Sequence, residues 1–156
     1  MKESDIPAIN NYLKKEYAQQ HAPIVEIIAA QTNDPFKILV TTILSARTKD
    51  QTTATVATRL FRTIDKPDDL RKLTQKQLET MIFPVGFYRT KAKHLKQLPA
   101  VMDKLFNGQM PDTIESLCQL PGVGRKTANL VMINAFNKHG MCVDVHVHRI
   151  SNRLGL

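Results

Sequence analysis

This chain of 156 residues lacks the features that mark several large classes of protein. It has only two cysteines, Cys118 and Cys142, which do not make a disulfide framework, so a reducing compartment fits. Its first residues contain no apolar signal core, and no uninterrupted apolar run approaches ~18 residues, the length of a membrane-spanning helix. No segment alternates apolar and polar residues as a strand does, and no low-complexity linker interrupts the chain. We therefore expect a soluble, cytoplasmic protein with no membrane partner.

Positive charge is present in excess. The chain has 22 lysine and arginine residues against 14 aspartate and glutamate residues, which gives a formal net charge of +8 and a pI near 9.7. Such an excess favours phosphate backbones electrostatically. A merely basic soluble protein would have the same composition, so charge alone leaves both interpretations open. With a nucleic-acid partner, the protein would be nucleoid-associated.

Apolar residues recur at helical spacing along nearly the whole chain. Asp34-Pro35 is typical of a helix start, because it places a capping side chain before a proline at the first helical position. Asn107-Gly108 is typical of a helix end. An amphipathic N-terminal helix is predicted by the stripe of Ile6, Ile9, Leu13 and Tyr17. The fold class that follows is all-α, with short loops.

Three further helix starts are predicted by capping boxes, in which two residues three apart exchange hydrogen bonds between side chain and backbone. The predicted pairs are Thr48 with Gln51, Thr74 with Gln77, and Asp112 with Glu115. A later segment, residues 128–136, is apolar on almost every side. A helix with that pattern is expected to be central and buried.

A glycine-containing run, LPGVGRKTA (residues 120–128), precedes that apolar segment. Gly122 and Gly124 can take positive φ and have no Cβ, so another backbone can come close. Free N–H groups at the start of the following helix then point outward, where a phosphate can bind. Residues 86–92 repeat the glycine, arginine and alanine of this run. This echo indicates either two helix N-termini that grip neighbouring phosphates or two ordinary glycine turns.

Lys126 lies in the first turns of the predicted helix. An unperturbed lysine has a pKa near 10.4, so only roughly one in 2,500 is neutral at pH 7. Partial burial, the helix N-terminus and adjacent Arg125 would each lower that pKa. A deprotonated amine can attack a sugar carbon and form a Schiff base. The alternative is a phosphate-binding or simply solvated lysine, and these residues alone leave both open.

Asp144 precedes another predicted helix, where it can act as an N-cap. Helix N–H groups also keep a carboxylate ionised, so Asp144 facing Lys126 could relay protons and stabilise positive charge on a sugar. A metal site formed by Cys142, Asp144, His146 and His148 is disfavoured. Histidines two apart do not share a helix face, and zinc sites rarely rest on one cysteine.

Four motifs, in order, resemble those of the endonuclease III branch of the helix–hairpin–helix DNA glycosylases. They are SARTKDQ (45–51), PVGFYRTKA (84–92), LPGVGRKTAN (120–129) and VDVHVHRISNRL (143–154). The likeness runs from about Phe36 to Leu154. It implies base-excision DNA repair by a bifunctional glycosylase and abasic-site lyase, which removes oxidised pyrimidines from damaged double-stranded DNA through a lysine Schiff base.

The resemblance also implies the residues of the site. Lys126 would be the Schiff-base nucleophile, and Asp144 would be its essential carboxylate partner. Arg47, Phe87 and His146 fall where family members fill or wedge the duplex around the extruded nucleotide. Position 47 is commonly glutamine in this branch and is arginine here. The other expected DNA contacts are Tyr88, Gly122, Gly124 and Arg125.

The family's fold implies two helical lobes with the lesion pocket between them. Residues 28–138 would form a six-helix lobe that contains the hairpin. Residues 1–27, an N-terminal helix and linker, and residues 139–156 would belong to the second lobe, which would be incomplete. We expect a monomer if the chain is complete, and a dimer through exposed apolar surface, including the N-terminal stripe, if it is truncated.

Family members usually continue into a loop whose four cysteines hold a 4Fe-4S cluster. Neither Cys118 nor Cys142 matches that loop, so this chain supports no cofactor, and we expect the cluster only if the native protein continues past Leu156. Two alternatives to the implied function stay open. One is a non-catalytic or truncated DNA-binding module, and the other is an oxidised-purine glycosylase, which also uses a lysine.

Overall fold

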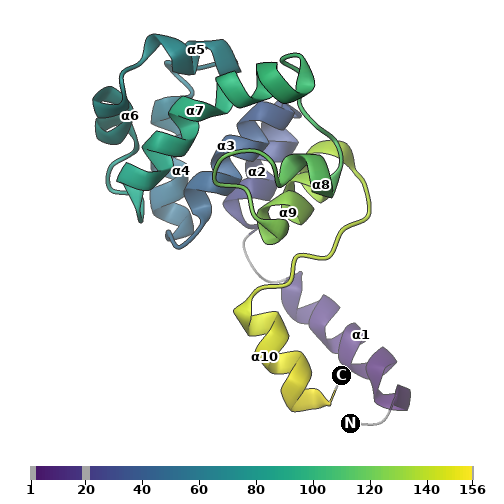
Figure 1. Cartoon of the computed structure of the whole chain (residues 1–156). Helices are drawn as coiled ribbons and strands as arrows, with labels where there is room; N and C mark the ends of the chain where they lie inside the picture. The colour runs from purple at the N-terminus through teal and green to yellow at the C-terminus, as the bar shows by residue number, and fades with distance from the viewer. Residues whose placement is uncertain (1–2, 19–21, 156) are drawn as a thin grey trace. The chain divides into compact units, whose positions relative to one another are not determined.

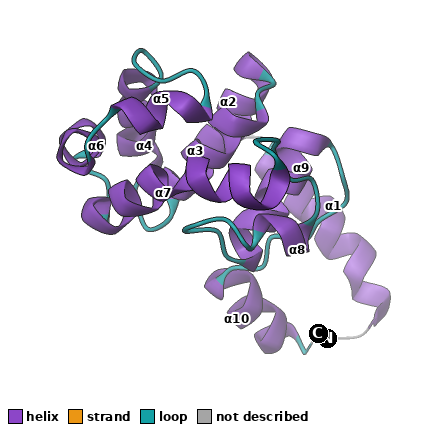
Figure 2. Cartoon of the chain, turned by 45° about the horizontal axis from the view of Figure 1, so that its top comes forward, coloured by secondary structure: helices purple, strands orange, loops and turns teal. Residues whose placement is uncertain are grey.

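The computed structural model describes residues 3–18 and 22–155, and over these residues the chain is helical with no strand (Figure 2). The predicted all-α fold is therefore confirmed. None of the described helices is long and apolar enough to cross a membrane. In chain order, the elements are the 3-10 helix η1 (Glu3–Asp5) and the α-helices α1 (Ile6–Tyr17), α2 (Ile24–Thr32), α3 (Pro35–Ser45), α4 (Asp50–Leu60), α5 (Pro67–Lys72), α6 (Gln75–Ile82), α7 (Tyr88–Phe106), α8 (Ile114–Leu117), α9 (Arg125–Phe136) and α10 (Val145–Leu154).

Local sequence signals determine several helix ends. The Asp34 side chain accepts a hydrogen bond from the backbone N–H of Phe36 at 2.9 Å and so caps α3. Thr74 and Gln77 form the predicted capping box of α6, with hydrogen bonds of 3.2 and 2.8 Å. Asn107 takes a left-handed conformation, with φ 52°, and ends α7 as expected.

The capping box predicted at Thr48 and Gln51 is wrong. Helix α4 begins at Asp50, and its N-cap residue Lys49 makes no side-chain capping hydrogen bond. The Thr48 hydroxyl is instead engaged by a distant part of the chain, because it accepts a hydrogen bond from the backbone N–H of Gly86 at 3.1 Å. A long-range partner has therefore replaced the local one.

The box predicted at Asp112 and Glu115 is also wrong, by one residue. Thr113 is the N-cap of the short helix α8, and its hydroxyl accepts a hydrogen bond from the backbone N–H of Ser116 at 3.2 Å. The Asp112 carboxylate forms an ion pair with Lys138 at 2.5 Å. That partner, from the segment after α9, competes with the capping role and lowers the pKa of Asp112.

The chain divides into two compact units (Figure 1). Unit 1 contains α1 and α10, and unit 2 spans residues 23–142 and contains α2 to α9. Residues 1–27 were expected to be an N-terminal helix and linker of the second lobe, whereas α2 begins at Ile24, and Ile24 and Val25 are buried in unit 2. Burial of these two apolar side chains explains why the helix starts there. The lobe boundaries at 27/28 and 138/139 stay a prediction.

Helix α3 is the centre of unit 2. Residues 38–44 are all buried, and α3 packs against α2, α4, α7 and α9. Helices α5 and α6 pack against the long helix α7 (Figure 1). This arrangement brings the end of α3 close to the starts of α7 and α9, two helix starts that each follow a glycine-containing loop.

Helix α9 is less buried than its sequence predicts. Its buried residues are Ala128, Asn129, Val131 and Met132, whereas Ile133 is exposed. The helix packs against α2, α3 and α8, so only part of its surface faces the core of unit 2. The expectation of a central, buried helix is therefore confirmed for the face that packs on α2, α3 and α8, and wrong for the face that carries Ile133.

Unit 1 exposes much of its apolar surface. On α1, Leu13 and Tyr17 are more than half exposed, Ile6 is also exposed and Ile9 is half-buried. On α10, Val145 is 69% exposed. The weak burial of the α1 stripe agrees with the expectation from the sequence.

Candidate functional site

The loop between α8 and α9 is a hairpin held by two buried side chains, Leu120 and Val123. The backbone N–H of Val123 donates a hydrogen bond to the carbonyl of Leu120 at 3.2 Å. Gly122 has φ 78°, and a Cβ at this residue would lie 2.7 Å from Nδ1 of His94. Both the left-handed backbone and the close neighbour therefore favour glycine at position 122.

Gly124 plays a different part from the one predicted. It is the N-cap residue of α9, its φ is −100°, and a Cβ there would meet nothing within 4 Å. Positive φ is thus found at Gly122 and not at Gly124. As a glycine, the N-cap residue has no side chain to cap the N-terminus of α9. Such a helix start, open to solvent at Gly124, is a site where anions bind readily.

Lys126 is the second residue of α9 and lies beside a small cleft. The cleft has a volume of about 110 Å³, and Arg47 also lines it, together with Ser45 at the end of α3. The structure therefore brings together two of the predicted site residues, Lys126 and Arg47, on facing elements. The partial burial expected for Lys126 is not found, because its side chain is exposed.

Arg47 and Phe87 share an uncommon backbone conformation. Their φ angles are 52° and 56°, in the left-handed region that few residues other than glycine adopt. Both side chains are exposed, and Phe87 is 67% exposed. An exposed side chain of this size on a constrained backbone is available to contact a partner.

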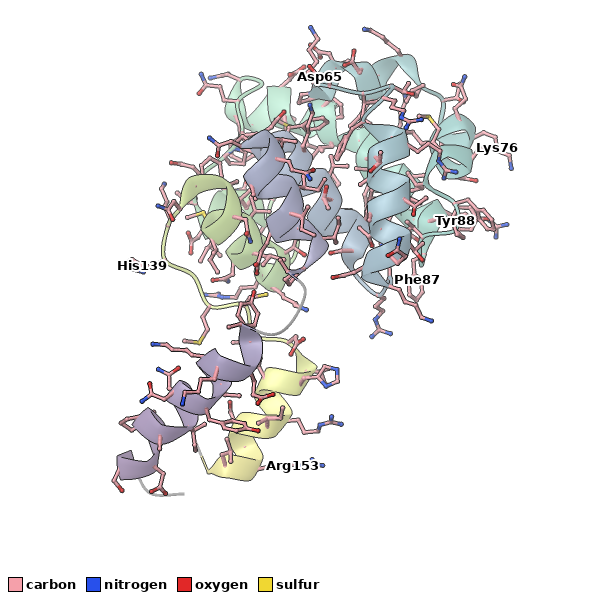
Figure 3. All side chains as sticks on the ribbon, turned by 180° about the vertical axis from the view of Figure 1, so that it is seen from behind. Asp65, Lys76, Phe87, Tyr88, His139 and Arg153 are labelled. Atoms are coloured by element: carbon pink, nitrogen blue, oxygen red, sulfur yellow. The ribbon has the colours of Figure 1, made fainter. Side chains whose placement is uncertain are left out.

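Tyr88 begins α7 directly after Phe87 (Figure 3). Its ring lies edge-on to that of Phe83, with 5.4 Å between the ring centroids. The guanidinium of Arg89 lies 5.4 Å from the centre of the Tyr88 ring. Tyr88 is half-buried, so these contacts fix its ring beside the exposed Phe87.

Lys91, for which no role was predicted, is buried in the first turn of α7. Its Nζ donates hydrogen bonds to the carbonyls of Leu44 and Ala46 at 2.8 and 2.6 Å, and reaches Oγ1 of Thr48 at 3.3 Å. Burial lowers the pKa of Lys91 to about 8, so the ammonium form still predominates at pH 7.

A signal for Lys91 was present in the sequence. Lys91 stands at helical spacing from Leu95, Leu98 and Met102, which are all buried. A lysine at the head of an apolar stripe indicates a buried amine with specific partners, because an unpartnered ammonium would be costly there.

Asp144 and His146 belong to unit 1, whereas Lys126 belongs to unit 2. Asp144 is the N-cap of α10, and its Oδ1 accepts hydrogen bonds from the backbone N–H groups of His146 and Val147, both at 2.9 Å. The predicted capping role is confirmed. That Asp144 faces Lys126 stays a prediction.

The segment that precedes Asp144 returns along α9. The Asn129 side chain donates to the carbonyl of Arg125 at 2.8 Å and accepts from the backbone N–H of Met141 at 2.9 Å. The Cys142 thiol lies 3.8 Å from the carbonyl oxygen of Lys126. The chain just before Asp144 is therefore tied to the helix that carries Lys126.

The described residues contain no group of three histidine, cysteine, aspartate or glutamate side chains that could hold a metal ion. Cys118 and Cys142 are not joined in a disulfide. A 4Fe-4S cluster needs four thiolate ligands. The residues present in the described part of the chain do not fit such a cluster.

The sequence of this chain is similar to those of known proteins. Residues 40–156 match the HhH-GPD superfamily of base excision DNA repair proteins. The chain is 43% identical over 122 residues to endonuclease III of Thermotoga maritima, covering 78% of this chain and 57% of that protein. It is 42% identical over 120 residues to endonuclease III-like protein 1 of Gallus gallus, covering 76% of this chain and 43% of that protein.

Solved structures agree with these relatives. The chain superposes on endonuclease III in a non-covalent complex with DNA with a TM-score of 0.87 and 34% identity, covering 99% of this chain and 70% of that one. A trapped covalent intermediate of endonuclease III and DNA matches with the same values. A thermostable thymine-DNA glycosylase matches with a TM-score of 0.76 and 28% identity, over 86% of this chain and 60% of that one.

Proposed function

Because this chain belongs to the HhH-GPD superfamily of base excision DNA repair proteins, we propose that it is a bifunctional DNA glycosylase and abasic-site lyase. The observation that carries this proposal is the position of Lys126, an exposed amine at the start of α9 beside the cleft lined by Arg47. We propose that its substrates are oxidised pyrimidines in double-stranded DNA, as the family resemblance implies.

DNA would be held first through its phosphates. The N-terminus of α9 offers backbone N–H groups and a positive dipole end to a phosphate, next to the exposed side chain of Arg125. Arg47 and Phe87 would fill the space left when the damaged nucleotide rotates out of the duplex. Extrusion costs a few kcal/mol and least at a damaged pair, so it contributes to selectivity.

Lys126 would then supply the nucleophile. Its neutral amine attacks C1′ of the extruded sugar, the bond from C1′ to the base breaks, and the base leaves with the electron pair and takes up a proton. The sugar ring opens, with a proton moving to the ring oxygen, and the lysine nitrogen becomes a Schiff base. Removal of a proton from C2′ breaks the C3′–O bond and nicks the strand, and water releases Lys126.

Asp144 would accept the proton that the attacking amine loses and stabilise positive charge on the sugar. Two observations support this role for Asp144. It lies in the VDVHVHRISNRL motif, and as the cap of α10 it accepts hydrogen bonds from two backbone N–H groups, which favour the carboxylate form. His146 would contact DNA from the same helix start. The chain spans 57% and 43% of the two named relatives, so their whole-protein activity is carried over here as part of the proposal.

The test is borohydride trapping on a duplex that contains one abasic site. The chain should form a covalent protein–DNA adduct, and Lys126→Gln should lower the yield by at least about a thousandfold, because glutamine keeps bulk and polarity but lacks the nucleophile. Lys104→Gln is the matched control, since Lys104 is an exposed lysine in the last turn of α7, and it should trap like the parent chain.

Each other outcome has a distinct meaning. An adduct with Lys126→Gln would show that another amine does the chemistry. Selective binding of abasic DNA without any adduct would favour the non-catalytic binding module. Release of an oxidised purine in preference to an oxidised pyrimidine would overturn the substrate assignment while leaving the reaction type in place.

A further inference from the structure

The buried ammonium of Lys91 closes the end of α3. The last carbonyl groups of an α-helix have no partner within the helix, and the negative end of the helix dipole lies there. Lys91 reaches across from α7 and donates to the carbonyls of Leu44 and Ala46, on the last turn of α3 and just after it. These acceptors and the Thr48 hydroxyl are all neutral, so the contact is a cap for the helix end and no ion pair.

The same hydroxyl joins a second loop to this cap. Oγ1 of Thr48 accepts from the backbone N–H of Gly86 at 3.1 Å and lies 3.3 Å from Nζ of Lys91. A Cβ at Gly86 would overlap the carbonyl oxygen of Arg47, so the two backbones approach as closely as glycine permits. The turn at residues 46–48 and the loop at residues 84–87 are therefore in direct contact.

Each of these two segments contains one strained residue. Arg47 and Phe87 both have positive φ, which costs about 1–2 kcal/mol for a residue with a Cβ. Such conformations persist only where the surroundings hold them. The surroundings shared by Arg47 and Phe87 are Lys91, Thr48 and Gly86.

We propose that Lys91 is a positioning residue that holds Arg47 and Phe87 as one preorganised pair, so that both side chains enter a damaged duplex together. This inference rests on the proposed function, because the pair needs a gap in a duplex to fill. Preorganisation would lower the cost of ordering the two side chains on binding, and it would do so only for a duplex in which both can insert.

The experiment compares affinity for a duplex with one abasic site with affinity for the intact duplex. Lys91→Met keeps most of the length of the side chain and removes its donors, and the abasic-to-intact affinity ratio should fall by about tenfold. Lys91→Arg, which keeps the donors, should recover part of the ratio. Affinity for the intact duplex should stay within about twofold, because Lys91 is buried and does not reach the DNA.

Lys96→Met is the matched control. Lys96 also donates from α7 to the end of another helix, through the carbonyls of Arg71 and Leu73 at 2.8 and 2.6 Å. Its loss should lower the melting temperature as Lys91→Met does, yet leave the affinity ratio unchanged. All affinities are measured below the melting temperature of each variant. Thr48→Val, which removes only the shared oxygen, should lower the ratio by a smaller factor and serves if Lys91→Met fails to fold.

If Lys91 acts through Arg47 and Phe87, its substitution should have little effect once those two side chains are removed. In a chain that already carries Arg47→Ala and Phe87→Ala, Lys91→Met should change the ratio by less than about twofold, because residues that act as one unit are not additive. A full tenfold loss in that background, or an unchanged ratio for Lys91→Met alone, would overturn the inference and leave the proposed function intact. A parent chain that does not distinguish the two duplexes would overturn both.

Discussion

The loop before α7 (residues 84–87) and the loop before α9 (residues 121–124) differ in what surrounds them. In the first, Gly86 touches the backbone of Arg47, and the nearby Lys91 is buried against three oxygen atoms. In the second, Gly124 faces open space and Lys126 is exposed beside a cleft. The two runs match at glycine, arginine and alanine, yet one lysine is buried and the other is exposed.

The position of a lysine within the first turn of a helix determines whether it faces the core or the solvent. Lys91 occupies the position that corresponds to Thr127, one residue after the position of Lys126, and on a helix one residue is a rotation of about 100°. That rotation turns Lys91 toward the core and toward α3. The echo of sequence indicates either two phosphate-gripping helix starts or two ordinary glycine turns, and both interpretations stay predictions.

The largest expected effect is a difference in the free energy of unfolding between alanine substitutions at Gly86 and at Gly124. Gly86→Ala should lower the free energy of unfolding by about 3 kcal/mol, because its Cβ would overlap the Arg47 carbonyl and backbone must move. Gly124→Ala should lower it by only about 1 kcal/mol, the cost of an alanine at an N-cap, because its Cβ meets nothing. Denaturant unfolding of both variants measures the difference. Equal effects would mean that the surroundings of Gly86 and Gly124 are equally open.

A second measurement on Gly124→Ala is its affinity for abasic DNA. With no steric contact inside the protein, a loss of affinity at this position would have to come from the bound DNA. The same measurement with a β-branched residue at Gly124 should give a larger loss while most of the helix content, followed by circular dichroism, is kept. Unchanged affinity in both would contradict a phosphate site at the start of α9.

A smaller effect is expected at Gly122, which combines strain and crowding. Gly122→Ala should cost about 2 kcal/mol, since its φ is 78° and its Cβ would lie 2.7 Å from His94. In a double-mutant cycle, His94→Ala should remove the cost of overlap with the His94 ring and leave the cost of the positive φ. The expected coupling energy is about 1 kcal/mol. Strict additivity of the two substitutions would show that His94 yields without cost.

The smallest effect is a pH dependence that Lys91 should produce. Its folded pKa of about 8 lies below the ordinary value of 10.5, so between these values the unfolded chain binds more protons. Stability from this group therefore rises as pH rises, by about 1 kcal/mol between pH 7 and pH 9. The free energy of unfolding of the parent chain, minus that of Lys91→Met, should increase by that amount. A flat difference would contradict the burial of the amine.

Features that depend on neighbours in sequence could be predicted. The start of α3 at Asp34, the box of Thr74 and Gln77 and the end of α7 at Asn107 all depend on hydrogen bonds within one turn. The helical class and the position of Lys126 at the head of α9 follow from the same kind of information. In each case no distant segment among the described residues offers the capping group another partner.

Tertiary structure decided the rest. Thr48 was expected to cap α4, but Gly86, which is 38 residues away, engages its hydroxyl. Asp112 lost its predicted capping role to Lys138, and α9 packs on only part of its surface. The joint setting of Arg47 and Phe87 likewise depends on Lys91 reaching from α7 to the end of α3. Sequence patterns determined which residues could cap a helix, become buried or react. Contacts between distant segments determined the partners of these residues, because a polar group in the folded chain bonds to whichever partner the packing of the helices brings within reach.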